Sequence, residues 1–530
     1  MFSLLLSIIS TKVIIRYQRK IKITIEKEKE SFPVYQRVIS RIILFLATLI
    51  AGGLAYYRNY FSQNSLEDVF FALTTNIGGT SSKVIKDISI YMFIFFVIFY
   101  AIATIIIYSN KYKLYLHIKK KKISLIPFEY LAKNKISGSL IILFLVLLVA
   151  YSSLGVKGYI QAIRNPGELY EKFYVDPMKA KLTFPEKKKN LVHIVLESME
   201  TTLFSVENGG GFQKSIIPEL ERLALENTSF TNDEKIASGL FEATGCSWTA
   251  SALVCQSSGV GLRSFFSSSD ELNSFLPGAY PLGKILGKED YNLKVIMGSD
   301  ASFHNRDKYY QDHGPYDILD YYRSIELGYI SQDYKNWWGY EDSKLYEISK
   351  SELSKLASED KPFAVTLLTA DTHFPDGYLD QSCPFLHDNQ YLSSYSCAST
   401  MLNNFLNWLK QQDFYKDTVV VITGDHLTMQ DKFFDFFPYE NRYIYNTFIN
   451  SSIKAPTKIR KATSFDIFPT IIASLGVEIE NNRLGLGTNL YSEAPTVLET
   501  LGKEEFQKET RAMSNYYNQK IARPKNGGRK

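Results

Sequence analysis

The segments NLVHIVLES at residues 190–198 and TVVVITGDHLTM at residues 418–429 decide the fold of the second half of the chain. Each is a short run of β-branched and aliphatic residues that ends in polar residues, which is typical of a strand buried on both faces of a parallel sheet. LKVIM at residues 293–297 and FAVTLLTA at residues 363–370 repeat the pattern, and apolar residues recur at helical spacing between them. The sequence therefore predicts an α/β domain with a central, mainly parallel sheet flanked by helices.

Chemically active side chains follow all four predicted strands. In chain order they are Glu197, then Ser299 and Asp300, then Asp371 and His373, and finally Asp425 and His426. Ligands of open α/β sheets bind beyond the carboxyl ends of the strands, so we expect these groups to converge on one crevice. Two carboxylates and an imidazole are a suitable set of metal ligands. A capping Asp beside a surface His is the alternative interpretation of residues 425 and 426 taken alone.

A hydroxyl-rich segment, ATGCSWTASALVCQSSG at residues 243–259, lies between the first two strands. Thr249 precedes a stretch with helical pattern, where backbone N–H groups and the helix dipole favour an oxyanion or a phosphate. A divalent cation held by Glu197, Asp425 and His426 would lower the pKa of the Thr249 hydroxyl and make it nucleophilic. A plain N-cap threonine is the alternative. Weaker nucleophile candidates are Thr244, Ser247 and Ser251.

Two further motifs add groups that suit a phosphate ligand. FHNRD at residues 303–307 contains His304 and Arg306, and DTHFPDG at residues 371–377 contains His373. An arginine can bind phosphate through two hydrogen bonds, and a histidine can stabilise a phosphoryl oxygen or carry a proton. A surface salt bridge for the arginine and a buried structural role for His373 are the alternatives.

The first part of the chain is predicted to lie in a membrane. Residues 88–108 and 136–156 are uncharged and long enough to span a bilayer, and residues 42–57 form a third candidate span. Residues 1–15 are apolar except for Lys12 and could be a fourth short span, an interfacial helix or an uncleaved signal-like segment. We therefore expect a multi-pass protein with three or four spans.

Loop charges set the expected orientation. Residues 16–41 and 111–135 are rich in Lys and Arg, whereas residues 58–87 contain few. The loops at 16–41 and 111–135 are therefore predicted to be cytoplasmic. Everything after Lys157 then lies outside the cytoplasmic membrane. The expected organisation is a membrane domain at 1–157, a linker at 158–189, a catalytic domain at 190–490 and a tail at 491–530. The net charge is only +5, and the basic residues lie in short runs, so nucleic acid is not an expected partner.

Taken in order, these motifs resemble a known family. The WTASALVCQSSG, HGPYD, NWWGYEDS, DTHFPDG and TGDHLTM segments are similar to those of the alkaline-phosphatase/sulfatase-like transferases. Within them, the chain resembles the membrane phosphoglycerol transferases of the lipoteichoic acid synthase and glucan phosphoglycerol transferase type. The likeness reaches upstream to LTTNIGGTSSKVI at residues 73–85.

The resemblance implies specific roles and partners. Glu197, Thr249, Asp425 and His426 would bind a divalent metal, with Thr249 as the nucleophile. His304, Arg306 and His373 would contact the phosphate and headgroup. The metal would be Mn²⁺, with Mg²⁺ or Zn²⁺ as alternatives, the donor phosphatidylglycerol in the bilayer and the acceptor a periplasmic or surface glycan. The resemblance also favours a disulfide between Cys383 and Cys397, while the state of Cys246 and Cys255 stays open.

Three other functions remain as alternatives. A phosphoethanolamine transferase would share the threonine nucleophile and the membrane anchor but use a different headgroup. A non-catalytic membrane receptor could use the same pocket to bind polyanions. A sulfatase is disfavoured because it needs a Cys or Ser in a CxPxR-like context, which neither Cys246 nor Cys255 has.

Overall fold

The computed structural model describes residues 16–17, 21–27, 33–60, 66, 76, 78–108, 112–118, 121–124, 134–263 and 274–524. The chain divides into two compact units. The first comprises residues 1–62 and 84–157, and the second comprises residues 63–83 and 158–530. Residues 63–83 therefore group with the second unit, although in the sequence they lie between two apolar helices and within the predicted membrane domain.

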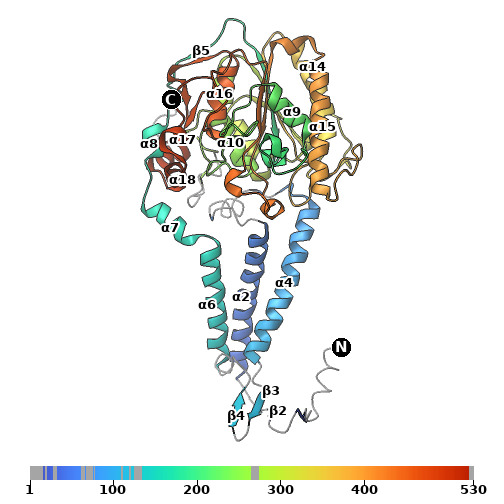
Figure 1. The fold of residues 1–530 in the computed structure, drawn as a ribbon, viewed down its shortest axis with the longest axis vertical. Helices are drawn as coiled ribbons and strands as arrows, with labels where there is room; N and C mark the ends of the chain where they lie inside the picture. The colour runs from blue at the N-terminus through green and yellow to red at the C-terminus, as the bar shows by residue number, and fades with distance from the viewer. Residues whose placement is uncertain are drawn as a thin grey trace. The chain divides into compact units, whose positions relative to one another are not determined.

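The first unit contains three helices that are long and apolar enough to cross a membrane, namely α2 (Val34–Tyr60), α4 (Ser82–Tyr108) and α6 (Lys135–Ser153) (Figure 1). They confirm the three predicted membrane helices. Leu44, Ala103 and Ile107 pack together between α2 and α4, whereas side chains such as Phe93 are largely exposed, as expected of helices that face lipid. Residues 1–15, the candidate fourth span, lie outside the described residues.

A small antiparallel sheet joins the loops of the first unit. Its strands are β1 (Arg16–Tyr17), β2 (Ile21–Lys27), β3 (Tyr112–Ile118) and β4 (Lys121–Ser124). Strand β2 precedes α2 and pairs with β3, which follows α4. The two lysine-rich loops must therefore lie on the same side of a membrane, as their charges predict.

The second unit is built on a sheet whose described strands lie in the order β11-β10-β6-β9-β7-β8. The neighbours β10, β6, β9, β7 and β8 are parallel, and β11 is antiparallel at one edge. The strands are β6 (Asn190–Leu196), β7 (Asn292–Met297), β8 (Tyr316–Leu319), β9 (Phe363–Leu368), β10 (Thr418–Gly424) and β11 (Asn446–Ile449). The predicted fold class is confirmed, and β6, β7, β9 and β10 coincide with the four predicted strands.

Both faces of this sheet are covered by helices, which explains why its strands are apolar throughout. Alternate residues point to opposite sides, so Ile194 packs in one core and Val195 in another. One face carries α9 (Pro218–Glu226), α14 (Asp342–Ala357) and α15 (Gln390–Leu409), which lie close together in Figure 1. The other carries α10 (Thr249–Ser258), α11 (Leu282–Lys288) and α16 (Ile467–Ser474).

The remaining elements surround this core. Among them are α7 (Val156–Arg164), α8 (Leu169–Phe173), α12 (Arg306–Asp312), α13 (Tyr321–Glu326), α17 (Val497–Leu501) and α18 (Lys503–Arg511). Phe506 and Tyr517, both from the predicted tail, are buried in the same core as Tyr170. The end of the described chain thus packs against the residues that lead into the second unit.

Candidate metal centre and active site

The register of the sheet brings two acidic residues together. Leu196 of β6 pairs with Gly424 of β10, and these are the last residues of two neighbouring parallel strands. The residues that follow, Glu197 and Asp425, therefore leave the sheet side by side. Both are almost completely buried.

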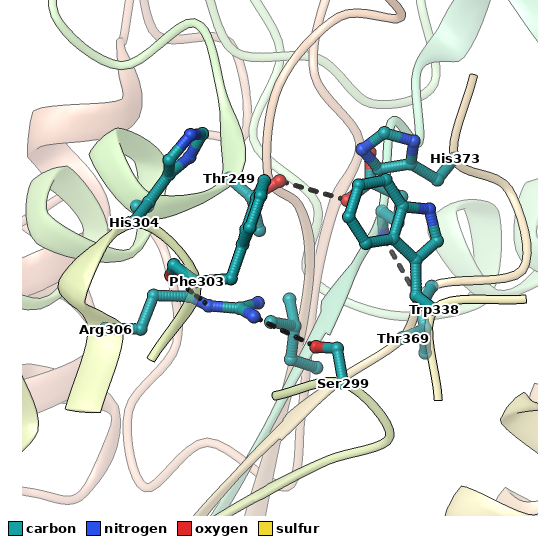
Figure 2. Close-up of a pocket in the computed structure, with 12 residues that line it drawn as sticks. Thr249, Ser299, Phe303, His304, Arg306, Trp338, Thr369 and His373 are labelled. Atoms are coloured by element: carbon teal, nitrogen blue, oxygen red, sulfur yellow. Dashed lines mark hydrogen bonds between the residues drawn. The ribbon is translucent and has the colours of Figure 1, made fainter. Parts of the chain in front are cut away.

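Thr249 lies at the first position of α10 and points toward this pair. Its Oγ1 donates a hydrogen bond of 3.1 Å to Glu197 Oε2 (Figure 2). Gln256, two turns further along α10, donates from Nε2 to the carbonyl of Gly424 at 2.8 Å. The helix that carries the hydroxyl is thus tied directly to the strand that ends at Asp425.

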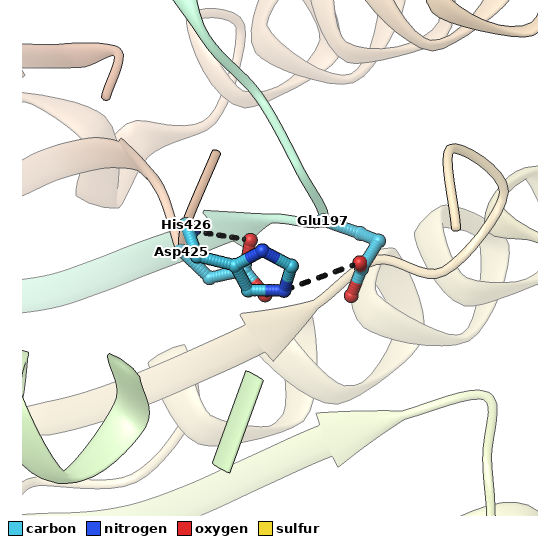
Figure 3. Close-up of side chains that lie close together, drawn as sticks. All are labelled: Glu197, Asp425 and His426. Atoms are coloured by element: carbon cyan, nitrogen blue, oxygen red, sulfur yellow. Dashed lines mark hydrogen bonds and ion pairs between the residues drawn. The ribbon is translucent and has the colours of Figure 1, made fainter. Parts of the chain in front are cut away.

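Glu197, Asp425 and His426 offer ligand atoms that all lie within 4.8 Å of one another (Figure 3). His426 Nε2 lies 3.3 Å from Asp425 Oδ2 and 3.5 Å from Glu197 Oε1. Within the part of the chain that the structure describes, this is the one such group of His, Cys, Asp and Glu residues. Together with Thr249 it contains all four predicted metal ligands.

The hydrogen bonds around these residues leave two buried atoms for a cation. Asp425 Oδ1 accepts from the backbone N–H groups of Ser198 and His426, each at 2.7 Å. His426 Nδ1 donates to the carbonyl of Leu427 at 2.8 Å. Asp425 Oδ2 and His426 Nε2 are both buried and have no hydrogen-bond partner among the residues that the structure describes. Such atoms are costly unless a ligand satisfies them, so the group fits a divalent metal ion.

The electrostatics point the same way. Burial opposes protonation of His426, but the carboxylates of Asp425 and Glu197 outweigh it and raise the pKa of the imidazole to about 9. Burial, reinforced by the charge of Glu197, raises the pKa of Asp425 to about 8. A cation bound by this group would therefore compete with protons for Asp425 and His426.

Glu197, Asp425 and His426 are called the metal group below. A buried ion pair fixes the loop that follows Asp425 and His426. Arg442 donates from Nε and Nη2 to the two carboxylate oxygens of Glu200, at 2.7 and 2.5 Å. Glu200 Oε1 also accepts from the backbone N–H of Thr428 at 3.1 Å. A bidentate arginine–carboxylate pair holds one geometry, so the chain after His426 is held against the chain after Glu197.

Both pairs of cysteines form disulfide bonds. Cys383 is bonded to Cys397, as the resemblance implied, and Cys246 is bonded to Cys255, a pairing that the sequence left open. The second bond encloses Thr249, because one cysteine precedes α10 and the other lies within it.

This placement gives a stability prediction with a built-in control. Replacing Cys246 and Cys255 together by Ala should lower the free energy of unfolding by about 2–3 kcal/mol, as expected for closing a loop of this length. It should also reduce catalytic turnover, because the start of α10 loses a constraint. The matched variant, with Cys383 and Cys397 replaced by Ala, should lower the stability similarly but leave turnover closer to normal. Equal losses of turnover in the two variants, measured beside thermal unfolding, would contradict the special role of the bond between Cys246 and Cys255.

Glu197, one member of the metal group, lines a pocket together with Thr249. Figure 2 shows Trp338 and His373 on one side of Thr249 and Phe303, His304 and Arg306 on the other. These opposite walls come from the loops after β9 and β7 and from the loop before α14.

Arg306 supplies fixed positive charge to the pocket. Its Nη2 donates to Ser299 Oγ at 3.0 Å and to the carbonyl of Asp300 at 2.7 Å, and its Nε donates to the carbonyl of Phe303 at 3.1 Å. The side chain is buried. Among the described residues its hydrogen-bond partners are a hydroxyl and two carbonyls and it forms no ion pair there, so its charge is suited to attract an anion.

The two pocket histidines are neutral. Burial lowers the pKa of His373, and burial followed by the charge of Arg306 lowers the pKa of His304 to about 3. His373 Nδ1 lies 2.8 Å from the carbonyl of Phe374. A carbonyl only accepts, so Nδ1 carries the proton and Nε2 has the lone pair. His304 stacks on Phe303 with ring centroids 4.0 Å apart.

All seven predicted site residues therefore lie in the pocket or in the metal group. Asp300 and Asp371, also expected in the crevice, do not line the pocket. Asp371 is buried and its Oδ2 accepts from the backbone N–H of Asp342 at 3.1 Å, so it joins two loops instead. Trp338 and Thr369 line the pocket without having been predicted. Trp338 belongs to the NWWGYEDS motif, and its place in that motif was the available signal.

The sequence pattern of the Sulfatase family matches residues 189–477, which is more than half of the chain. The protein therefore belongs to the Sulfatase family. The match begins just before β6 and ends just after α16, so it contains the sheet, the metal group and every residue that lines the pocket.

Particular relatives are more informative about chemistry. Two proteins named Phosphoglycerol transferase I, from Escherichia coli O6:K15:H31 (strain 536 / UPEC) and from Shigella flexneri, are each 29% identical over 331 residues. The alignments cover 60% of this chain and 41% of each relative, so the chain spans about two fifths of the length of the curated relatives it matches.

Two solved structures are similar at low identity. The lipoteichoic acid synthase LtaP from Listeria monocytogenes is 21% identical, with 62% of this chain and 81% of that chain covered and a TM-score of 0.47. The integral membrane protein lipooligosaccharide phosphoethanolamine transferase A (EptA) from Neisseria meningitidis is 13% identical, with 91% and 88% covered and a TM-score of 0.49. Both TM-scores are below 0.5.

Proposed function

We propose that this protein is a membrane-anchored, metal-dependent transferase that moves phosphoglycerol from phosphatidylglycerol to a periplasmic or surface glycan and releases diacylglycerol. The observation that carries the proposal is the hydrogen bond of 3.1 Å from Thr249 to Glu197, beside Asp425 and His426. The names of the curated relatives support the headgroup, and the three apolar helices support a donor that stays in the bilayer. An anchored enzyme meets such a donor at high effective concentration.

In the first half-reaction Thr249 Oγ1 attacks the phosphorus of the donor. Its proton leaves toward Glu197 Oε2, which already accepts the hydrogen bond. The bond from phosphorus to the diacylglycerol oxygen breaks, that oxygen takes up a proton from water, and glycerophosphate remains esterified to Thr249. A divalent metal held by Glu197, Thr249, Asp425 and His426 would supply positive charge that lowers the pKa of the threonine hydroxyl and offsets charge on the phosphate.

In the second half-reaction a sugar hydroxyl attacks the same phosphorus, and Thr249 leaves and takes back the proton that Glu197 received. His373 is neutral with its lone pair on Nε2, so it can accept the proton of the incoming hydroxyl. Arg306 lines the same pocket as Thr249, and a fixed donor of this kind would stabilise charge that develops on the phosphate oxygens in the transition state. His304, which is uncharged and stacked on Phe303, is suited to contact the headgroup rather than to exchange protons.

The charges of the pocket favour glycerol over ethanolamine as the headgroup. Glu197 is the only acidic residue among the described residues that line the pocket, and it belongs to the metal group. An ammonium group would thus face Arg306 without an acidic partner. Two carboxylates, a threonine oxygen and one imidazole suit Mn²⁺, which we propose as the ion, with Mg²⁺ and Zn²⁺ as alternatives. The loop charges support a location of this unit outside the cytoplasmic membrane.

The test uses the purified full chain in detergent with headgroup-labelled phosphatidylglycerol and Mn²⁺. We expect diacylglycerol to form only when the metal is present, and at least about tenfold faster than from phosphatidylethanolamine, because one unmatched charge in a desolvated pocket costs more than 1 kcal/mol. Release from phosphatidylethanolamine alone would favour the phosphoethanolamine transferase. Tight binding of polyanions without release from either lipid would favour the receptor.

A further inference from the structure

The proposed reaction leaves one motif of the resemblance without a role, the segment at residues 76–83 between α2 and α4. Its described residues, which are 76 and 78–83, group with the second unit. The segment contacts the chain on both sides of the pocket, at positions more than 200 residues away in the sequence. These contacts involve backbone atoms and polar or charged side chains.

The first contact is with the turn that leads to Arg306. The carbonyl of Asn76 accepts a hydrogen bond of 2.8 Å from the backbone N–H of His304, and Asn76 Nδ2 donates to Ser302 Oγ at 3.1 Å. Gly79 approaches the same turn so closely that a Cβ there would lie 2.6 Å from Asp300 Cβ. Its φ of +83° also disfavours any other residue.

This turn is strained and needs support. His304 and Asn305 are consecutive non-glycine residues in the left-handed region, with φ of 54° and 58°. Such a conformation costs free energy and persists only where the surroundings hold it. Phe303 and Arg306, on either side of the two residues, both line the pocket. The hydrogen bond from His304 to Asn76 therefore holds the geometry of one pocket wall.

The second contact is with the opposite wall. Lys83 Nζ forms an ion pair of 2.8 Å with Asp376 Oδ2 and lies 5.3 Å from the centre of the Trp337 ring. Trp337 is also left-handed, with φ of 52°, and is followed by Trp338, which lines the pocket. Asp376 lies three residues after His373. One short segment thus holds a strained turn in each of the two walls.

We propose that segment 76–83 is a positioning element for the pocket, which fixes the distance between the wall of Phe303 and Arg306 and the wall of Trp338 and His373. It touches neither the metal group nor the reacting atoms. Small displacements of such walls lower turnover strongly, because the reacting groups must be aligned. As a role in catalysis, the inference rests on the proposed function.

The test compares variants of the full chain. Gly79→Val should lower kcat for diacylglycerol release at least about tenfold with little change in Mn²⁺ affinity, since it displaces one wall and not the metal group. Asn76→Ala is the milder variant should Gly79→Val fold poorly. Lys83→Glu should lower kcat about fivefold, the size of an exposed ion pair. The exchanged pair Lys83→Glu with Asp376→Lys should recover most of that loss.

A matched control is Lys86→Glu, which makes the same charge change one turn later on α4 and should leave kcat unchanged. Hydrogen exchange provides a readout that needs no substrate. In Gly79→Val, or in Asn76→Ala, the amides of residues 302–306 should exchange at least about tenfold faster than in the wild type. If the variants show faster amide exchange but the wild type shows no transferase activity, the proposed function is contradicted and the positioning role is not. Unchanged amide hydrogen exchange in the variants would overturn the inference. So would a double variant, Lys83→Glu with Asp376→Lys, that recovers none of the lost kcat.

Discussion

Thr249→Ala should reduce diacylglycerol release from phosphatidylglycerol by roughly 10³-fold or more, because removing a nucleophile removes the covalent route altogether. The substitution deletes the Oγ1 atom that donates to Glu197 and leaves α10 intact, since alanine is a good helix former. Mn²⁺ affinity should fall by much less, because Glu197, Asp425 and His426 remain. The assay is the labelled-lipid release described above, with Mn²⁺ binding measured by calorimetry.

Thr249→Ser is the matched control for this result. It keeps the hydroxyl and should retain measurable turnover. Mass spectrometry of wild-type protein quenched with donor and without acceptor should find the glycerophosphate adduct on the peptide that contains Thr249. Full turnover by Thr249→Ala, or an adduct on Thr244 or Ser247, would move the nucleophile to another residue of the same segment.

Asp425→Asn should weaken Mn²⁺ binding by about 100-fold or more and reduce lipid turnover correspondingly. The amide oxygen can still accept the hydrogen bonds from Ser198 and His426, so the loop should keep its shape. What is lost is the negative charge at Oδ2, the buried atom without a partner. Removal of metal by a chelator should abolish wild-type activity, and added Mn²⁺ should restore it.

The control for this prediction is a second buried aspartate. Asp466 accepts from the backbone N–H groups of Thr463 and Thr488, each at 2.8 Å, but lies at the start of α16 away from the metal group. Asp466→Asn should lower thermal stability and leave Mn²⁺ affinity unchanged. Equal effects of the two substitutions on metal binding would show that loss of Asp425 acts through general destabilisation.

The strands and the metal group could be predicted because both depend on local patterns. Strands covered on both faces need continuous apolar runs, and in a parallel sheet the residues just after neighbouring strands lie together. Glu197 and Asp425 were found in this way, and the pairing of Leu196 with Gly424 gives the physical reason. Thr249 was found because a hydroxyl at a helix start, among small residues, has a chemical use.

Other features depend on contacts that no local pattern records. Asp371 follows a strand just as Glu197 does, yet it turns away to bind the N–H of Asp342. Trp338 reaches the pocket because Trp337 before it is left-handed, a conformation that tryptophan does not indicate in a sequence. The pairing of Asn76 with Ser302 joins positions separated by 226 residues. The small sheet of β2 and β3 was also missed, because charge dominates the pattern of those loops.

The bond between Cys246 and Cys255 determines the stage of biosynthesis at which the segment around Thr249 becomes covalently closed. Newly synthesised chains begin with reduced thiols in the cytosol, and such bonds form in oxidising surroundings. With the second unit outside the cytoplasmic membrane, as proposed, the covalent link that encloses Thr249 would close only after that unit has crossed the membrane.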